Sequence, residues 1–230
     1  MLTIGVLGGM SWESTLTYYR RINQLVRAAL GGHHSAQLVI ASVDFAAIEH
    51  LQRDEDWSAA ADALSAASAP LADCELRLLA TNTMHLVFPQ LNEATGGRWL
   101  HIADACAAAL TAHGYSRPLV LGTRFTMERD FYLTCLRGAG LTPQVPAEHD
   151  RNEVDRIIFQ ELVHGRVLGP SRRQLVDIAA TGAAAGADSV LLACTELGLI
   201  LDEGNVPLPL IDSTEAHCRH AVNLALERES

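Results

Sequence analysis

Lysine is absent from this sequence, and all 17 basic residues are arginine. A pyridoxal-phosphate enzyme needs a lysine to hold its cofactor as a Schiff base, so the sequence excludes that class of enzyme. Lysine-dependent aldolases are excluded on the same ground. P-loop nucleotidases are excluded as well, because their GxxxxGK motif contains lysine.

Cysteine is scarce and irregularly placed. The five cysteines are odd in number and are never spaced as CxxC, which argues against a disulfide framework and against a cysteine zinc site. The ten histidines form no HExxH motif and no tight cluster of ligands. We therefore expect no metal.

Positive charge and long apolar runs are also in short supply. A net charge of −10 makes the chain a poor binder of nucleic acid or of an anionic membrane surface. No apolar run approaches the roughly 18 residues that a membrane span needs. Residues 1–9 lack a basic region and run directly into a strand and turn, so we expect no signal peptide and a cytoplasmic location.

Apolar runs that are typical of buried strands alternate with amphipathic helical patterns. Such alternation predicts a parallel α/β sheet with crossover helices. We expect two pseudo-symmetric lobes, residues 1–113 and 114–230, and the C-terminal helix of the first lobe is free to pack on the second. Each lobe is expected to hold a mostly parallel four-stranded sheet flanked by helices. The expected strands are residues 2–7, 37–43, 76–80 and 99–102 in the first lobe, and residues 117–121, 141–145, 189–193 and 209–211 in the second.

The ends of these strands repeat. Three polar or glycine strand ends of the first lobe each recur roughly 110 residues later, which indicates an internal duplication. The matched pairs are Gly8 with Gly122, Thr81 with Cys194, and Asp104 with Asp212. We assign structural roles to the two aspartates. Two similar lobes are expected to place their strand ends at one shared cleft, because ligands of open parallel sheets bind beyond the carboxyl ends of the strands.

The pair Thr81 and Cys194 has a chemical use. Two proton carriers on opposite faces of a carbon atom have the geometry of racemisation, in which one group removes the α-proton and the other returns a proton. A thiol has a reference pKa of about 8.5, and surroundings that lower it towards neutrality make the thiolate an efficient general base. Backbone N–H groups after each strand end can receive a carboxylate and stabilise the charge that develops on it. These groups belong to Asn82, Thr83, Thr195 and Glu196.

The sequence resembles the aspartate/glutamate racemase family, the cofactor-independent amino-acid racemases. Four stretches carry the resemblance in order along nearly the whole chain: Ile4-Gly5-Val6-Leu7-Gly8-Gly9-Met10, Thr81-Asn82-Thr83-Met84-His85, Ala193-Cys194-Thr195-Glu196 and Pro209-Leu210-Ile211-Asp212. The resemblance implies two α/β lobes with the site between them, no cofactor, and Cys194 as one of the two acid/base groups.

One motif departs from the family. The first motif is usually Cys-Asn-Thr, and here it is Thr81-Asn82-Thr83. A threonine hydroxyl is far less acidic than a thiol, so Thr81 can pass a proton to a carbanion but can scarcely start the reaction. Since the resemblance assigns the cysteine of the second lobe to the L-enantiomer, we expect racemisation of L-aspartate, L-glutamate or a broader set of L-amino acids, with weak initiation from the D side.

Further residues are candidates for substrate binding. Met10 and Gly9 lie in the first glycine turn, whose backbone can approach a ligand closely. Gln52 and Arg53 follow the second strand, where the resemblance implies a receptor for a side-chain carboxylate. The family also uses a lysine from the second lobe for that carboxylate, and the absence of lysine makes Arg124 and Thr126 candidates to replace it. His85 is expected either beside the cleft or as a core or cap histidine.

Several alternatives stay open. Hydantoin racemase, maleate isomerase and arylmalonate decarboxylase belong to the same superfamily, and they differ in which strand end bears a cysteine. A non-catalytic amino-acid-binding protein also fits two lobes with one cysteine lost. The expected partner is a small amino-acid substrate, and a homodimer is left open.

Overall fold

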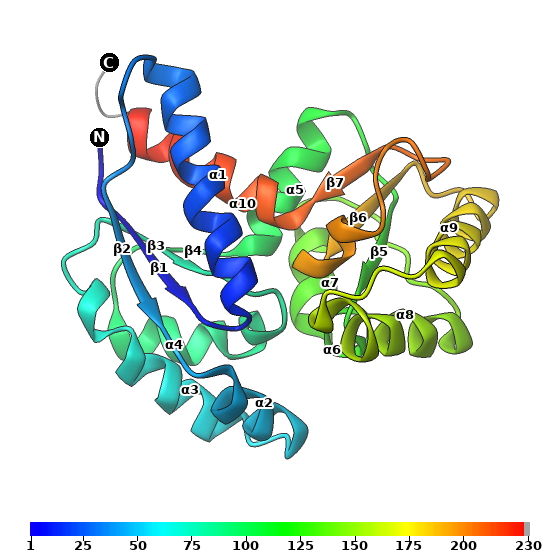
Figure 1. Ribbon diagram of the computed structural model, residues 1–230, viewed down its shortest axis with the longest axis horizontal. Coiled ribbons are helices and arrows are strands. Elements are labelled where there is room, and N and C mark those ends of the chain that lie inside the picture. Colours follow the sequence, from blue (N-terminus) through cyan, green and yellow to red (C-terminus); the bar gives the residue numbers. More distant parts are fainter. Residues whose placement is uncertain (228–230) are drawn as a thin grey trace. The chain divides into compact units, whose positions relative to one another are not determined.

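The computed structural model describes residues 1–227, and by its internal contacts the chain divides into two units (Figure 1). The first unit is Met1–Ile102 together with the residues from Thr214 onward, and the second is Ala103–Ser213. This division differs from the predicted boundary after residue 113. The last helix returns to the first unit because Cys218, Ala221 and Val222 are buried in the same apolar cluster as the first strand.

The first unit is built on a parallel four-stranded sheet. Its strands β1 (Ile4–Gly8), β2 (Leu38–Ser42), β3 (Leu76–Leu79) and β4 (Trp99–Leu100) lie in the order β2-β1-β3-β4. Side chains alternate between its two faces, as the pleat requires. Ile4 and Val6 join one buried cluster, whereas Leu7 joins another.

Helices cover both faces of this sheet. The cluster around Ile4 and Val6 includes apolar residues of α1 (Trp12–Leu30) and α10 (Ser213–Leu226). The cluster around Leu7 includes apolar residues of α2 (Phe45–Arg53), α3 (Trp57–Ala67) and α4 (Phe88–Thr95), with the 3₁₀ turns η1 (Ala69–Leu71) and η2 (Thr83–Val87). The strand β1 is therefore buried on both faces, which is why its sequence is a continuous apolar run, as expected of parallel sheets.

The second unit has a three-stranded parallel sheet, in the order β5-β6-β7. These strands are β5 (Pro118–Gly122), β6 (Ser189–Ala193) and β7 (Leu210–Asp212). Residues of the helices α8 (Glu148–Gln160) and α9 (Gly169–Ala184) are buried against Leu119, Leu121 and Leu192. The unit also holds most of α5 (Ile102–Ala112), with α6 (Arg124–Glu128), α7 (Asp130–Gly138) and the 3₁₀ turns η3 (Leu162–His164) and η4 (Thr195–Leu199).

The predicted fourth strand of the second sheet is wrong. Residues 141–145 run beside β5 but form only one isolated parallel bridge, Leu119 with Gln144. The N–H of Thr142 donates to Ser116, just before β5, the N–H of Gln144 donates to Pro118, and the N–H of Val120 donates back to the carbonyl of Gln144. The N–H groups of Thr142 and Gln144 are those on the side of β5, and Pro146 removes the next donor because proline has no backbone N–H. The short helix α6 is not predicted by the sequence pattern.

The two units nevertheless share one topology. The order β2-β1-β3-β4 of the first unit matches the order of segment 141–145, β5, β6 and β7 in the second. In both, a 3₁₀ turn follows the third member of the set, η2 after β3 and η4 after β6. This correspondence agrees with two of the repeated strand ends, Gly8 with Gly122 and Thr81 with Cys194. The third pair is wrong, because Asp212 ends β7 whereas Asp104 lies inside α5. None of the helices within residues 1–227 combines the length and apolar character needed to cross a bilayer.

Candidate active site

The Thr81 tip, residues 80–83, leaves the carboxyl end of β3 beside the end of β1. The strand register pairs Leu7 with Leu79, and the N–H of Ala80 donates to the carbonyl of Leu7 at 2.9 Å. The N–H of Thr81 turns back onto the carbonyl of Leu79 at 2.9 Å. The glycine turn after β1 and the Thr81 tip therefore emerge side by side from one edge of this sheet.

The tip residues themselves are well packed. Thr81, Asn82 and Thr83 are all buried. The carbonyl of Thr81 lies 2.7 Å from Nδ1 of His85. On the other side of the same ring, the N–H of Ile102 donates to Nε2 at 3.1 Å. The side chain of His85 is therefore part of the core and contacts the backbone of the Thr81 tip.

His85 is neutral in this environment. It is 1% exposed, its ring stacks on Phe88, and its edges meet the rings of His101 and His217. Burial lowers the pKa of His85 well below its ordinary value, and the neighbouring histidines act in the same direction. Of the two expected placements, beside the cleft or in the core, the structure shows a core histidine that bonds to the tip.

The glycine turn after β1 is shaped by protein contacts. Gly9 has φ +93°, and a Cβ there would lie 2.2 Å from the carbonyl oxygen of Val43. Its N–H donates to Oγ1 of Thr15 at 2.8 Å. A Cβ on Gly8 would lie 2.4 Å from the same Oγ1. The glycines are thus required by packing, and the N–H of Gly9 is already engaged, while Met10 is buried next to them.

The two candidates on α2 are placed differently. Gln52 is buried, and its side-chain amide lies 2.9 Å from the sulfur of Met84, the residue that follows the Thr81 tip. Arg53 points to solvent, with its side chain 63% exposed and an ion pair of 3.6 Å to Glu49. The structure thus brings Gln52, and not Arg53, to the residues of the first tip.

The Cys194 tip, residues 194–196, leaves β6 beside the end of β5. The register pairs Gly122 with Ala193. The thiol of Cys194 donates to Oε2 of Glu196 at 3.1 Å, and the hydroxyl of Thr195 donates to the same oxygen at 2.6 Å. One carboxylate oxygen therefore accepts hydrogen bonds from both polar groups of the tip.

Burial raises the pKa of the Cys194 thiol well above its ordinary value, and the negative charge of Glu196 raises it further. The backbone N–H groups of Glu196 and Leu197 act in the opposite direction. Only 7% of Cys194 is exposed. The surroundings of Cys194 therefore raise this pKa instead of lowering it towards neutrality, and the resting group is a thiol bonded to a carboxylate.

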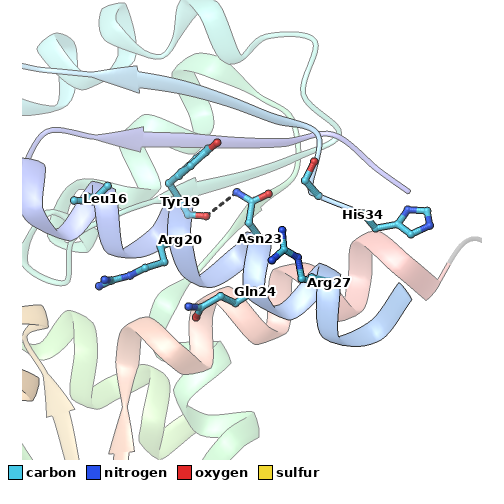
Figure 2. Close-up of a pocket in the computed structure, with 8 residues that line it drawn as sticks. Leu16, Tyr19, Arg20, Asn23, Gln24, Arg27 and His34 are labelled. Atoms are coloured by element: carbon cyan, nitrogen blue, oxygen red, sulfur yellow. Dashed lines mark hydrogen bonds between the residues drawn. The ribbon is translucent and has the colours of Figure 1, made fainter. Parts of the chain in front are cut away.

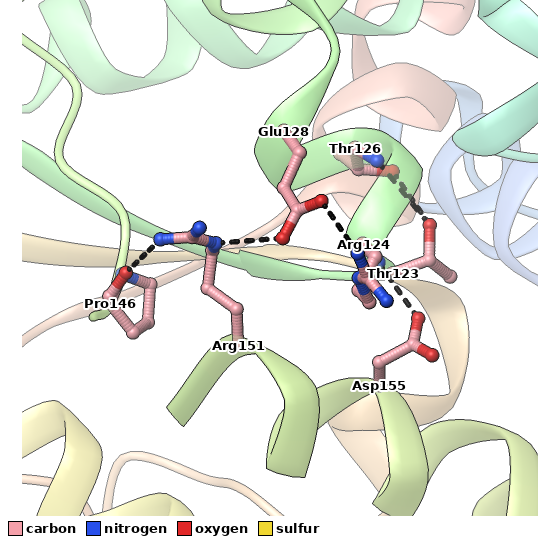
Figure 3. Close-up of polar contacts among 7 residues, drawn as sticks. All are labelled: Thr123, Arg124, Thr126, Glu128, Pro146, Arg151 and Asp155. Carbon is pink, nitrogen blue, oxygen red and sulfur yellow. Dashed lines mark hydrogen bonds and ion pairs between the residues drawn. The ribbon is translucent and has the colours of Figure 1, made fainter. Parts of the chain in front are cut away.

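The short helix α6, which follows β5, holds the two remaining candidates, Arg124 and Thr126 (Figure 3). The N–H of Arg124 donates to Asp155 at 2.8 Å, and its guanidinium pairs with Glu128 at 3.2 Å. Glu128 also accepts from Arg151 at 3.0 Å. Thr126 is fully buried, with its hydroxyl 3.2 Å from that of Thr123. Arg124 is thus held in an ion-pair network, and Thr126 completes a helix cap.

A pocket of about 460 Å³ lies on a different part of the first unit, along α1 (Figure 2). None of the candidate residues named above lines it. Its walls are made by Leu16, Tyr19, Arg20, Asn23, Gln24, Arg27, His34 and Ser35.

Two residues that support the candidate site were not predicted from the sequence. Thr15 holds the glycine turn through its hydroxyl, and Ile102 holds His85 through its N–H. A sequence signal existed for the histidine, because His85 lies four residues after Thr81 in a helical turn and can reach back to the carbonyl of the tip. No sequence signal linked His85 to Ile102, since that contact depends on the pairing of β3 with β4.

Comparison with known proteins gives consistent matches over the whole chain. The family model described as Asp/Glu/Hydantoin racemase matches residues 7–221. The broad specificity amino-acid racemase RacX of Bacillus subtilis is 23% identical, over 99% of this chain and 100% of that protein. Crystal structures add a candidate Asp/Glu racemase from Yersinia pestis, at 41% identity and a TM-score of 0.92, covering 99% of this chain and 100% of that one. An aspartate racemase homologue from Pyrococcus horikoshii is 35% identical, with a TM-score of 0.85 and the same coverage.

Proposed function

The chain belongs to the Asp/Glu/hydantoin racemase family and is a racemase, and from this premise we propose that it converts L-amino acids, with Cys194 as the base and the Thr81 side as the proton donor. The substrates proposed are L-aspartate and L-glutamate, or a broader set of L-amino acids. No cofactor takes part in this proposal.

The observation that carries the proposal is the contact of 3.1 Å between the Cys194 thiol and the Glu196 carboxylate. A buried thiol cannot remove an α-proton until its own proton has moved to an acceptor. Glu196 is such an acceptor at hydrogen-bond distance. The N–H groups of Glu196 and Leu197, which favour the thiolate, support the sulfur once it is charged.

The thiol proton moves to Glu196, and the thiolate then takes the α-proton of the L-substrate, which restores the thiol. The charge that forms on the substrate carboxylate is stabilised by backbone N–H groups of the tips. The hydroxyl of Thr81 delivers a proton to the opposite face of the α-carbon while it takes one from water, so no free alkoxide forms. Glu196 releases its proton to solvent.

The proposal predicts an asymmetry between enantiomers. Cys194 has an acceptor for its proton, whereas a threonine hydroxyl is too weakly acidic to serve as a base at neutral pH. In deuterium oxide, L-glutamate and L-aspartate are expected to exchange their α-proton much faster than the D-enantiomers. Equal exchange rates from the two enantiomers would overturn the assignment of Thr81, and loss of exchange in Cys194→Ser would support the assignment of Cys194.

Substrate range depends on what receives the side chain. The chain has no lysine, Arg53 pairs with Glu49 and Arg124 pairs with Glu128. Buried Gln52 is neutral and bonds equally well to an amide or to a carboxylate. We therefore propose a range broader than the acidic amino acids, and RacX, described as having broad specificity, is a relative with that property. A panel of L-amino acids, assayed by NMR in deuterium oxide, tests this range directly.

The resting thiol of Cys194 favours one second candidate, an arylmalonate-type decarboxylase. That reaction replaces removal of the α-proton by loss of carbon dioxide and needs a single thiol as proton donor. A protonated Cys194 meets that requirement without help from Glu196. Release of carbon dioxide from an arylmalonate, with no α-proton exchange from any L-amino acid, would favour this candidate over a racemase.

A further inference from the structure

We infer that His85 is a positioning residue, a neutral imidazole that fixes the Thr81 tip against the start of α5, and this inference rests on the proposed role of Thr81. Nδ1 of His85 lies 2.7 Å from the carbonyl of Thr81, and Nε2 accepts the N–H of Ile102 at 3.1 Å. A ring can donate from Nδ1 and accept at Nε2 together only as the neutral tautomer protonated at Nδ1.

The ring is fixed in place from all sides. The Phe88 ring is parallel to it with centroids 5.4 Å apart, and the His101 ring meets it edge-on at 4.6 Å. The His217 ring lies at 6.0 Å and is itself held, with Nε2 at 2.9 Å from the carbonyl of Leu100. Since the ring is buried and bonded at both nitrogens, it connects the carbonyl of Thr81 to the backbone just after β4.

Holding that carbonyl also sets the direction of the Thr81 side chain. The carbonyl and the Cα–Cβ bond belong to the same residue, so a turn that loses its anchor can rotate the hydroxyl away from the substrate. Misplacement of a reacting group by about 1 Å can cost roughly 100-fold in rate. The expected defect is therefore in kcat for proton return, with a much smaller change in KM.

Substitutions at His85 can remove its two hydrogen bonds one at a time or together. Asparagine offers an N–H in place of Nδ1, glutamine reaches towards Ile102 as an acceptor, and phenylalanine keeps the ring but removes both. We expect H85N to retain most of kcat, and H85Q and H85F to lose roughly 10- to 100-fold. Trp99→Phe is the matched control, a buried ring on β4 whose N–H bonds to Thr95 at 2.9 Å and which plays no part in holding His85. It is expected to change stability but not the ratio of proton exchange to proton return.

Two measurements stay informative if the proposed function fails. Nitrogen NMR of the histidine side chains should find His85 protonated at Nδ1 in the wild-type chain. Hydrogen exchange at the Ile102 amide should speed up in H85F and in H85N but stay slow in H85Q, which retains the acceptor. A proton on Nε2, or wild-type kcat in H85F, would overturn the inference. A correct tautomer in a chain without exchange activity would instead refute only the role of Thr81.

A second inference comes from the pocket along α1, where the geometry points to a binding site for a small organic anion with an aromatic body. Arg20, Arg27 and His34 line the pocket, and among residues 1–227 no carboxylate lines it (Figure 2). The chain as a whole carries a net charge of −10, so this is a locally basic surface on an acidic protein. Cations grouped in a concave surface attract anions.

The charges of this pocket are not neutralised from within. Neither Arg20 nor Arg27 has an ion-pair partner in the part of the chain that the structure describes, whereas their neighbour Arg21 pairs with Glu215. Leu16 and Tyr19, 54% and 49% exposed, supply an apolar wall and an aromatic ring beside the cations. A phosphate monoester or carboxylate attached to a flat apolar group meets both features.

Three probes separate charge from shape. 1-Naphthyl phosphate carries both features, 1-naphthol has the body alone, and inorganic phosphate has the charge alone. Saturation-transfer NMR is expected to show binding of 1-naphthyl phosphate that weakens with salt. The double variant R20Q/R27Q is expected to bind it at least about tenfold more weakly. R98Q/R137Q is the control, because it removes the same net charge from two other exposed arginines.

Each outcome decides the second inference. Equal binding of 1-naphthol, or equal weakening in R98Q/R137Q, would mean an adventitious apolar contact or a general charge effect and would overturn it. Sedimentation provides a further check on the occupant. If R20Q/R27Q changes the oligomeric state of the chain without ligand, the pocket is part of an interface between two copies, and the inference fails.

Discussion

Replacement of Glu196 by glutamine should raise the thiolate fraction of Cys194 and lower the rate of α-proton exchange. Glutamine keeps the size of the side chain and can accept the Cys194 hydrogen bond, but it carries no charge and cannot take up the thiol proton. If Glu196 is the proton acceptor, α-proton exchange from L-amino acids should fall. If its charge disfavours the thiolate, the thiolate should at the same time become more common.

The magnitude follows from the distance. The donor sulfur lies 3.1 Å from Oε2 of Glu196. Two unit charges about 4 Å apart at an effective dielectric constant of about 20 repel by roughly 4 kcal/mol, which is an upper limit here because the carboxylate charge is spread over two oxygens. Loss of that repulsion should raise the thiolate fraction roughly 10- to 100-fold. Loss of a general base costs roughly 100- to 10,000-fold in rate.

Two assays on the same preparations test the reasoning. Alkylation by iodoacetamide, followed by peptide mapping, reports the thiolate at Cys194, with half-buried Cys135 as an internal reference. Exchange of the α-proton of L-glutamate in deuterium oxide reports the chemistry. The control is Thr195→Val, which removes the other donor to the same carboxylate oxygen but leaves the charge and the acceptor.

Faster alkylation together with slower exchange is the expected result in E196Q. If exchange rises in parallel with alkylation, Glu196 only suppresses the thiolate and is not the acceptor. If neither rate changes, the contact seen between the two side chains has no part in the reaction.

Three further predictions follow from other parts of the molecule. Thr81→Cys should raise α-proton exchange from D-glutamate by roughly 100-fold or more while leaving L-side exchange within a few fold, because a thiol replaces a weakly acidic hydroxyl. Gly8→Ala should destabilise the fold by roughly 1–3 kcal/mol in denaturant titrations, since the new Cβ would lie 2.4 Å from Oγ1 of Thr15. Gly138→Ala, where nothing lies within 4 Å, should be neutral or slightly stabilising. Burial lowers the pKa of His217 from 6.5 to about 3, so the unfolded chain takes up its proton first as the pH falls. Stability should therefore drop between pH 6.5 and 3 by about 1.4 kcal/mol per pH unit from this group, and His217→Gln should remove that part of the slope.

The sequence predicted much of the fold because its strands are buried on both faces and end at glycine or polar residues. The strand positions, the parallel α/β class and the family were all available from the pattern and the motifs. The expected strand at residues 141–145 shows the limit. Pro146 carries the signal against it, but only the neighbouring β5 shows that a single bridge survives.

Chain composition and local pattern determine what each residue can do: a thiol can move a proton, a chain without lysine cannot hold pyridoxal phosphate, and a glycine can adopt a positive φ. Only the tertiary structure decided the protonation state of two of these groups, Cys194 and His85. Cys194 is a thiol because burial and the carboxylate of Glu196 both disfavour its charge. His85 is a neutral bond donor to Thr81 because residues distant in sequence, Ile102 and His217, surround it. Protonation depends on local dielectric and on charges brought close by folding, and the order of residues along the chain does not contain either quantity.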